Sequence, residues 1–232
     1  MKVFAISDPH LSLAQEKPMD VFGQHWTGHW EKIVKSWEQS VAPEDVVVVA
    51  GDLSWAMSYE DAAPDLAAIS RLPGRKVLIR GNHDYWHGSL KRTREMLEEG
   101  TYFLQNDAVR LGEYTFCGAR GWKQRGAEDF DAQDEKIFSR ELGRLRLSLA
   151  AGKKLGGELI GVCHYPPFSQ SHERSEFSDL YAEAGVRTVI YGHLHGQYIR
   201  KEEYEDICID GVRYHLTSCD YLGFELKRIC QE

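Results

Sequence analysis

Five short motifs rich in Asp, His and Asn recur along the chain, and each follows a stretch that is typical of a buried β-strand. The predicted strands are Lys2–Ser7, Val46–Ala50, Lys76–Arg80, Glu158–Cys163 and Arg187–Tyr191. The motifs after them are Asp8-Pro9-His10, Gly51-Asp52, Gly81-Asn82-His83-Asp84, His164 and Gly192-His193-Leu194-His195. Open α/β sheets bind ligands in the crevice outside the carboxyl ends of their strands. The repetition therefore predicts one polar site at the edge of a sheet.

The residue types in these motifs are ligands for a pair of metal ions. In an extended segment, side chains at i and i+2 lie on the same side. Asp8 with His10, and His193 with His195, can thus each direct two ligands to one place. Asp52 is the natural bridge, because one carboxylate can bind a metal through each oxygen. Oxygen and imidazole ligands without thiolates suit Mn, Fe or Zn and disfavour a structural zinc site.

The rest of the chain alternates between strand and helix patterns. Apolar residues recur every three or four positions from Trp26 to Val41, which indicates a helix. Further helices are predicted at Tyr59–Arg71, where Pro64 is expected to shift or kink the start, at Ser89–Glu99 and at Asp131–Ala151. Hairpins are predicted at Ala108–Leu111 with Tyr114–Gly118 and at Asp206–Ile209 with Val212–Leu216, before a last strand, Phe224–Ile229. We expect a single domain over residues 1–232, with two packed sheets flanked by helices.

The order and spacing of the five motifs resemble those of the calcineurin-like metallophosphoesterase superfamily. The resemblance runs from Asp8 to His195. It implies a mixed α/β fold, a four-layer α-β-β-α sandwich of two mixed sheets flanked by helices. Pro9 departs from the family pattern, but its fixed φ suits a turn and removes neither neighbouring ligand.

The resemblance also implies a role for each site residue. It assigns one transition-metal ion, divalent or trivalent, to Asp8, His10, Asp52 and His195, and a second ion to Asp52, Asn82, His164 and His193. His83 would be the catalytic histidine that protonates the leaving oxygen or stabilises the transition state, with Asp84 orienting it. The expected reaction is hydrolysis of a soluble small-molecule phosphomonoester or phosphodiester.

Other branches of the superfamily fit the sequence less well. Protein Ser/Thr phosphatases resemble Gly-Asp-x-x-Asp-Arg-Gly at the second motif, whereas this chain has Gly51-Asp-Leu-Ser-Trp-Ala and lacks that arginine. Repair nucleases need a basic groove, and a formal net charge of −8 makes nucleic acid an improbable partner. The alternatives left open are a nuclease of the same superfamily and a non-catalytic scaffold with this fold.

Several expectations rest on composition. The sequence has five cysteines and no Cys-x-x-Cys motif, so reduced thiols in a cytoplasmic protein are expected. No apolar run is long enough for a membrane span. Neither the oligomeric state nor the exact substrate follows from the sequence.

Some residues near the motifs have two readings. Trp55, Trp86 and Trp122 follow strand ends and could either line a substrate pocket or pack in the core. A solvated role is favoured for Arg120 and Arg125 over a contact with substrate phosphate. His25 and His29 have helical spacing but no third ligand, so a surface or helix-face role is expected. The segment 169–178 is predicted to be a loop at the mouth of the site.

Overall fold

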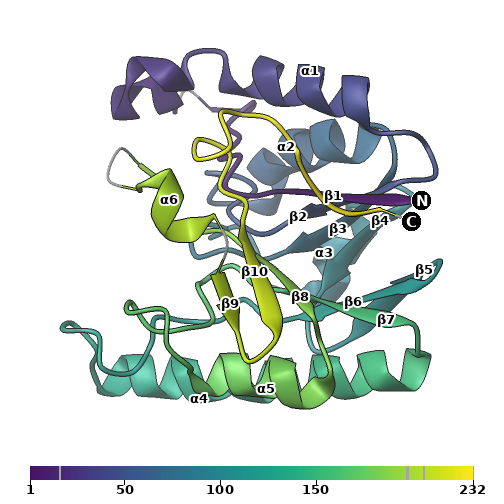
Figure 1. Cartoon of the computed structure of the whole chain (residues 1–232). Coiled ribbons are helices and arrows are strands. Elements are labelled where there is room, and N and C mark those ends of the chain that lie inside the picture. Colours follow the sequence, from purple (N-terminus) through teal and green to yellow (C-terminus); the bar gives the residue numbers. More distant parts are fainter. Residues whose placement is uncertain (16, 197–198, 206, 232) are drawn as a thin grey trace.

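Two β-sheets form the centre of the protein. The computed structural model describes residues 1–15, 17–196, 199–205 and 207–231. The first sheet has the strand order β11-β1-β2-β3-β4, in which only β11 is antiparallel to its neighbour (Figure 1). Its strands are β1 (Lys2–Ile6), β2 (Val46–Val49), β3 (Arg75–Ile79), β4 (Thr101–Leu104) and β11 (Lys227–Gln231).

The second sheet has the order β5-β6-β7-β8-β10-β9. Its strands are β5 (Ala108–Leu111), β6 (Tyr114–Gly118), β7 (Glu158–Val162), β8 (Thr188–Tyr191), β9 (Ile207–Ile209) and β10 (Val212–Leu216). The four middle strands are parallel, and β5 and β9 form antiparallel edges. Within each sheet, four neighbouring strands are therefore parallel, and their carboxyl ends lie at the same edge of that sheet.

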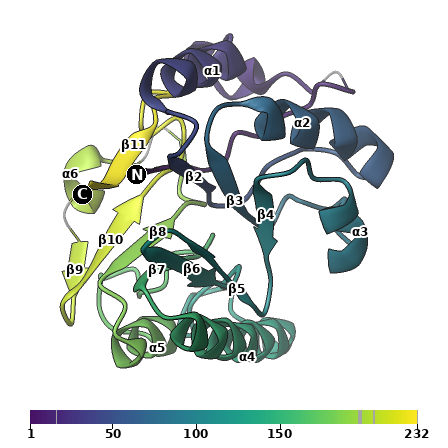
Figure 2. The ribbon, with the colours of Figure 1, turned by 90° about the vertical axis from the view of Figure 1, so that its right-hand side faces the viewer.

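Helices cover the outer face of each sheet, which gives the expected four layers (Figure 2). The first sheet is covered by α1 (His29–Ser40) and α2 (Tyr59–Arg71), with α3 (Leu90–Glu95) beside β4. The second sheet is covered by α4 (Ala132–Leu155) and α5 (Glu176–Ala184). Two 3-10 turns, η1 (Met19–Phe22) and η2 (Gln24–Trp26), precede α1, and α6 (Lys201–Tyr204) precedes β9. In the described part of the chain, no helix is long and apolar enough to cross a membrane.

Side chains alternate along each strand, so the strands of the first sheet contribute to one core on each face of that sheet. Val46 and Val48 face the second sheet in the core between the sheets. Val47 and Val49 face the core beneath α1 and α2. A third core lies between the second sheet and helices α4 and α5. A continuous β-branched run is therefore buried on both faces, as a strand inside such a sandwich requires.

Most predicted elements are present with shifted ends, and some are not as expected. Helix α2 has the predicted bounds, and Pro64 does not shift its start, because the Ser58 side chain caps the helix by accepting from Asp61 N. The predicted helix Ser89–Glu99 is only Leu90–Glu95, and β4 follows it unpredicted. The last strand begins at Lys227 rather than Phe224, whose φ is 65°. Asp206, the first residue of the second predicted hairpin, lies outside the described residues.

Candidate metal centre

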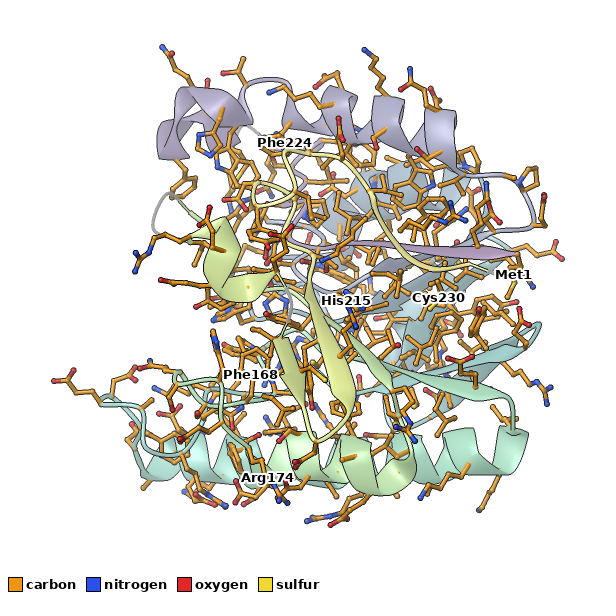
Figure 3. The ribbon with its side chains drawn as sticks, viewed as in Figure 1. Met1, Phe168, Arg174, His215, Phe224 and Cys230 are labelled. Carbon is orange, nitrogen blue, oxygen red and sulfur yellow. The ribbon has the colours of Figure 1, made fainter. Side chains whose placement is uncertain are left out.

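All five motifs lie at the carboxyl ends of strands from both sheets. Asp8 follows β1, Asp52 follows β2 and Asn82 follows β3, while His164 follows β7 and His193 follows β8. Both chain termini lie on the opposite side of the molecule, at the amino end of β1 (Figure 1); Met1 and Cys230 mark that end in Figure 3. Four of the site residues have left-handed backbone, with φ of 56° at Asp8, 46° at His10, 51° at Asp52 and 71° at His193. Such φ values are unfavourable for L-residues and concentrate at functional sites.

The Asp52 carboxylate lies between two groups of imidazoles. Its Oδ2 is 3.7 Å from His10 Nε2 and 3.4 Å from His164 Nε2. Its Oδ1 accepts a hydrogen bond of 2.8 Å from the backbone N–H of His83. Asp52 is thus held through Oδ1 and presents Oδ2 to both sides, so a bridge here would run through one oxygen rather than through each of the two.

The two ligand groups expected from the sequence are both assembled. On one side, ligand atoms of Asp8, His10 and His195 lie within 4.8 Å of one another. On the other side, Asn82 Oδ1 is 2.7 Å from His164 Nε2 and 2.9 Å from His193 Nδ1. Asp8, Asp52 and His164 form a further group within 4.8 Å, which joins the two sides. The structure therefore brings all seven predicted ligands together.

The buried polar atoms of this cluster fit a pair of cations. Both ring nitrogens of His10 and the Oδ2 of Asp52 are buried without a hydrogen-bond partner, and burial without a partner costs free energy. His164 Nδ1 lies 2.9 Å from the carbonyl of Ala50. A proton on Nδ1 that is donated to this carbonyl leaves the lone pair of Nε2 directed at the cluster, a common arrangement in metal-binding histidines.

Burial also sets the protonation of the ligands. It lowers the pKa of His10 and of His193 to about 3 each, so both imidazoles are neutral at pH 7 and have a lone pair to donate. Burial works to raise the pKa of Asp52, but His164 and His10 outweigh it and hold that pKa below its usual range. Burial works to lower the pKa of His164, but the Asp52 carboxylate outweighs it and raises that pKa to about 9, so this imidazole holds a proton at pH 7 that a bound cation would have to displace. Neutral imidazoles and an ionised carboxylate are the forms that bind metal.

His83 lies beside the ligand cluster and is half-buried. Its ring centroid is 5.6 Å from that of His10 and 4.6 Å from that of Trp55. Trp55 in turn stacks on His10 at 4.6 Å. Trp55 therefore contacts the site with its ring and also packs against the core beneath α1 and α2.

Asp84, which was expected to orient His83, makes no hydrogen bond with the His83 side chain among the described residues. Its carboxylate accepts hydrogen bonds from the backbone N–H groups of Gly81, Leu53 and Ser54 and from Trp86 Nε1, while His83 Nδ1 has no partner. Asp84 is fully buried and ties the turn after β3 to the turn after β2. Any influence of Asp84 on His83 therefore runs through the backbone of the turn.

The other open readings divide between core and site. Trp86 is buried against Tyr59 and Phe103 and belongs to the core. The Arg120 side chain is only 10% exposed and pairs with buried Glu141, so the expected solvated role is wrong for this residue. His29, expected to have only a surface or helix-face role, lies with Nε2 3.0 Å from the carbonyl of Pro9 and so contacts the first motif.

Contacts that sequence patterns did not reveal complete the site. The Ser7 hydroxyl donates to Asp8 Oδ2 at 2.5 Å, and the Cys219 thiol donates to the Asp8 carbonyl at 3.0 Å. The Tyr165 ring lies 4.1 Å from the His193 ring, centroid to centroid. Tyr165 directly follows the ligand His164, which is the one signal that could have marked it.

Comparisons with known proteins agree with this geometry. The family model described as calcineurin-like phosphoesterase matches residues 1–197. The gene 66 protein of Mycobacterium phage D29 is 24% identical over 202 residues, which cover 85% of this chain and 80% of that protein.

Two solved structures share the fold. The protein TT1561 of Thermus thermophilus has a TM-score of 0.59 at 14% identity, over 97% of this chain and 96% of its own. The protein of unknown function AQ665 from Aquifex aeolicus has a TM-score of 0.53 at 16% identity, over 98% of this chain and 95% of its own. With its motifs, its layers and this match in agreement, the chain belongs to the calcineurin-like phosphoesterase family.

Proposed function

We propose that this protein is a dinuclear metal-dependent phosphoesterase that hydrolyses a soluble phosphomonoester or phosphodiester. The observation that carries the proposal is the unpartnered Oδ2 of Asp52, which is buried between His10 Nε2 and His164 Nε2. Two transition-metal ions (Mn, Fe or Zn) would supply Lewis acidity for the phosphoryl group and lower the pKa of water.

The residues divide into two ligand sets that share Asp52. Asp8, His10 and His195 complete the first set, and Asn82, His164 and His193 complete the second. His83 belongs to neither ligand set, so we assign it the role of the general acid that protonates the leaving oxygen. Asp84 positions the turn that carries His83, through its hydrogen bond from Gly81 N. Three buried free thiols, of Cys117, Cys163 and Cys219, favour the cytoplasm as the place of action.

The test combines metal content with hydrolysis. Protein purified without chelator should contain close to two transition-metal equivalents and hydrolyse p-nitrophenyl phosphate or bis-p-nitrophenyl phosphate. Chelation should abolish the activity, and Mn, Fe or Zn should restore it. Asp52→Asn, purified in parallel, controls for contaminating phosphatase and should be inactive.

The alternative function, a non-catalytic scaffold, predicts a different result. Such a protein would hydrolyse neither ester above the level of Asp52→Asn, whatever its metal content. A single metal equivalent at full activity would contradict the bridging role of Asp52.

A further inference from the structure

A large cavity adjoins the proposed metal centre on the side of the second sheet. Its volume is about 650 Å³, within the range of small-molecule sites. The walls are residues 122–127 after β6, residues 165–172 after β7, His193 with Leu194 after β8, and Tyr204 of α6. Because His193 is also a predicted metal ligand, a group bound here would be continuous with a phosphoryl group at the metals.

Aromatic side chains form much of this wall. The ring centroids of Trp122 and Tyr165 are 5.1 Å apart. The ring centroids of His172, in the loop before α5, and Tyr204, on α6, are 5.2 Å apart. Phe168, which is almost fully buried, contacts the ring of His172 and packs on Tyr191; Figure 3 shows it above α4 and α5, on the second-sheet side of the site. Such surfaces bind flat rings by stacking.

The cationic side chains of the wall are already paired. Lys123 Nζ lies 2.8 Å from Asp129 Oδ2 and 2.7 Å from Asp134 Oδ2. Arg125 pairs with Glu135 and with Glu176. The two positive charges of Lys123 and Arg125 are thus matched by four carboxylates, those of Asp129, Asp134, Glu135 and Glu176. The wall therefore offers neither Lys123 nor Arg125 as an unpaired cation to a second anionic group of the substrate.

From the rings and the charges together, we infer that the cavity receives an uncharged aromatic part of the substrate and disfavours substrates with a second phosphate there. The inference rests on the proposed function, because it places the phosphoester at the metals beside His193. A hydrogen bond of 2.9 Å from Gln124 Nε2 to the Pro166 carbonyl joins two of the loops, so this part of the wall is preformed.

Direct binding of uncharged probes to the purified protein tests the aromatic preference. Adenosine should bind at least about tenfold more tightly than ribose in calorimetric titrations. Tyr204→Ala should weaken adenosine roughly tenfold. Tyr102→Ala, which removes a 37%-exposed tyrosine from β4, is the matched control and should bind like the wild type. Equal binding of adenosine and ribose, or equal effects of the two variants, would overturn the inference.

The charge argument has its own test. Adenosine 5′-monophosphate should be a better ligand than adenosine 3′,5′-bisphosphate, measured as kcat/KM or as inhibition of aryl phosphate hydrolysis. Asp129→Asn removes one exposed carboxylate that pairs with Lys123. This variant should reduce the preference for the monophosphate over the bisphosphate. Glu38→Gln on α1, in the helix layer of the other sheet, should not. A preference for the bisphosphate would refute the exclusion of a second anion.

These results separate the two proposals. If adenosine binds in a Tyr204-dependent way but no ester is hydrolysed, the proposed function fails and the cavity assignment stands. If esters are hydrolysed while adenosine fails to bind, the cavity assignment fails and the proposed function stands.

Discussion

The imidazole of His83 is close to the ligand cluster and independent of it. Its backbone N–H donates to a predicted ligand, Asp52, and its ring meets that of His10 edge-on, but its Nδ1 has no hydrogen-bond partner among the described residues. His83→Ala should therefore keep its metals and lose rate by roughly 10²–10⁴, the usual contribution of proton transfer from a positioned side chain. An alkyl phosphate should lose most, because its alkoxide needs the proton, and an aryl phosphate least. Steady-state rates with both esters, alongside metal analysis, give the answer. An equal loss for both would mean that His83 stabilises phosphoryl charge.

Asp52 and His195 should differ in how many metals they hold. Asp52 lies between both ligand groups, whereas His195 is grouped only with Asp8 and His10. Asp52→Ala should lose both metals, and His195→Ala should weaken mainly one. Metal content after dialysis against graded chelator measures this difference. Equal loss of both metals from His195→Ala would show that the ligand assignment is wrong.

At this scale the sequence predicted which residues meet, because each ligand ends a strand and the strands of a sheet end together. It did not predict how neighbours support them. Asp84 was expected to orient His83, but its hydrogen bonds to Leu53 N and Ser54 N, about thirty positions away, did not follow from the sequence. His29 reaches Pro9 in the same way. Such contacts depend on how turns pack, which sequence spacing does not encode.

At the scale of elements, helices and strands with a strongly periodic or continuous apolar pattern were predicted well, whereas short elements without such a pattern were not. The strand predicted at Val46–Ala50 is β2, Val46–Val49, one residue shorter, and helix α2 has the predicted bounds. By contrast, the segment 169–178 was predicted to be a loop throughout, yet α5 begins within it at Glu176. Ser175 caps that helix by accepting from Phe177 N and Ser178 N, so a serine-rich stretch that suggested a loop is partly a helix start. Residues 169–172 do lie at the cavity, as a loop at the mouth should.

His87 links two of the poorly predicted elements, and its titration should be visible in stability. Its Nδ1 lies 2.8 Å from Thr93 Oγ1 in α3, its Nε2 lies 3.0 Å from Gln105 Oε1 after β4, and its ring stacks on Phe103. Burial lowers the pKa of His87 to about 4 from 6.5. Between these values the unfolded chain binds a proton that the folded chain does not, so acid favours unfolding.

The contribution of His87 to the free energy of unfolding should therefore be complete above about pH 6.5. It should decrease by up to about 3 kcal/mol as the pH falls toward 4. Urea titrations of the wild type and of His87→Gln at several pH values measure the effect. The variant should have a lower stability at pH 7 and a shallower loss on acidification. Parallel pH curves for the two proteins would contradict the assignment.

At the scale of the whole molecule, the sandwich explains why one site can draw on residues from Asp8 to His195. The five strands that precede the motifs, β1, β2 and β3 of the first sheet and β7 and β8 of the second, end on the same side. Strand β11 completes the first sheet by pairing with the edge of β1 that β2 leaves free. The four layers were predicted from the resemblance and from the alternation of elements. The strand order was not predicted, because the turns that set it carry no periodic signal.

The charge of the whole molecule predicts weak binding to nucleic acid. The formal net charge is −8, and the two cations in the wall of the cavity are paired with carboxylates. Affinity for duplex DNA comes largely from cations that neutralise phosphates and release counterions, with a steep dependence on salt. We therefore expect no binding to a random duplex at micromolar protein in physiological salt. Fluorescence anisotropy of a labelled duplex across a salt series tests this. Micromolar binding that weakens steeply with salt would require a cationic track along the surface and would favour the nuclease alternative over a small-molecule phosphoesterase.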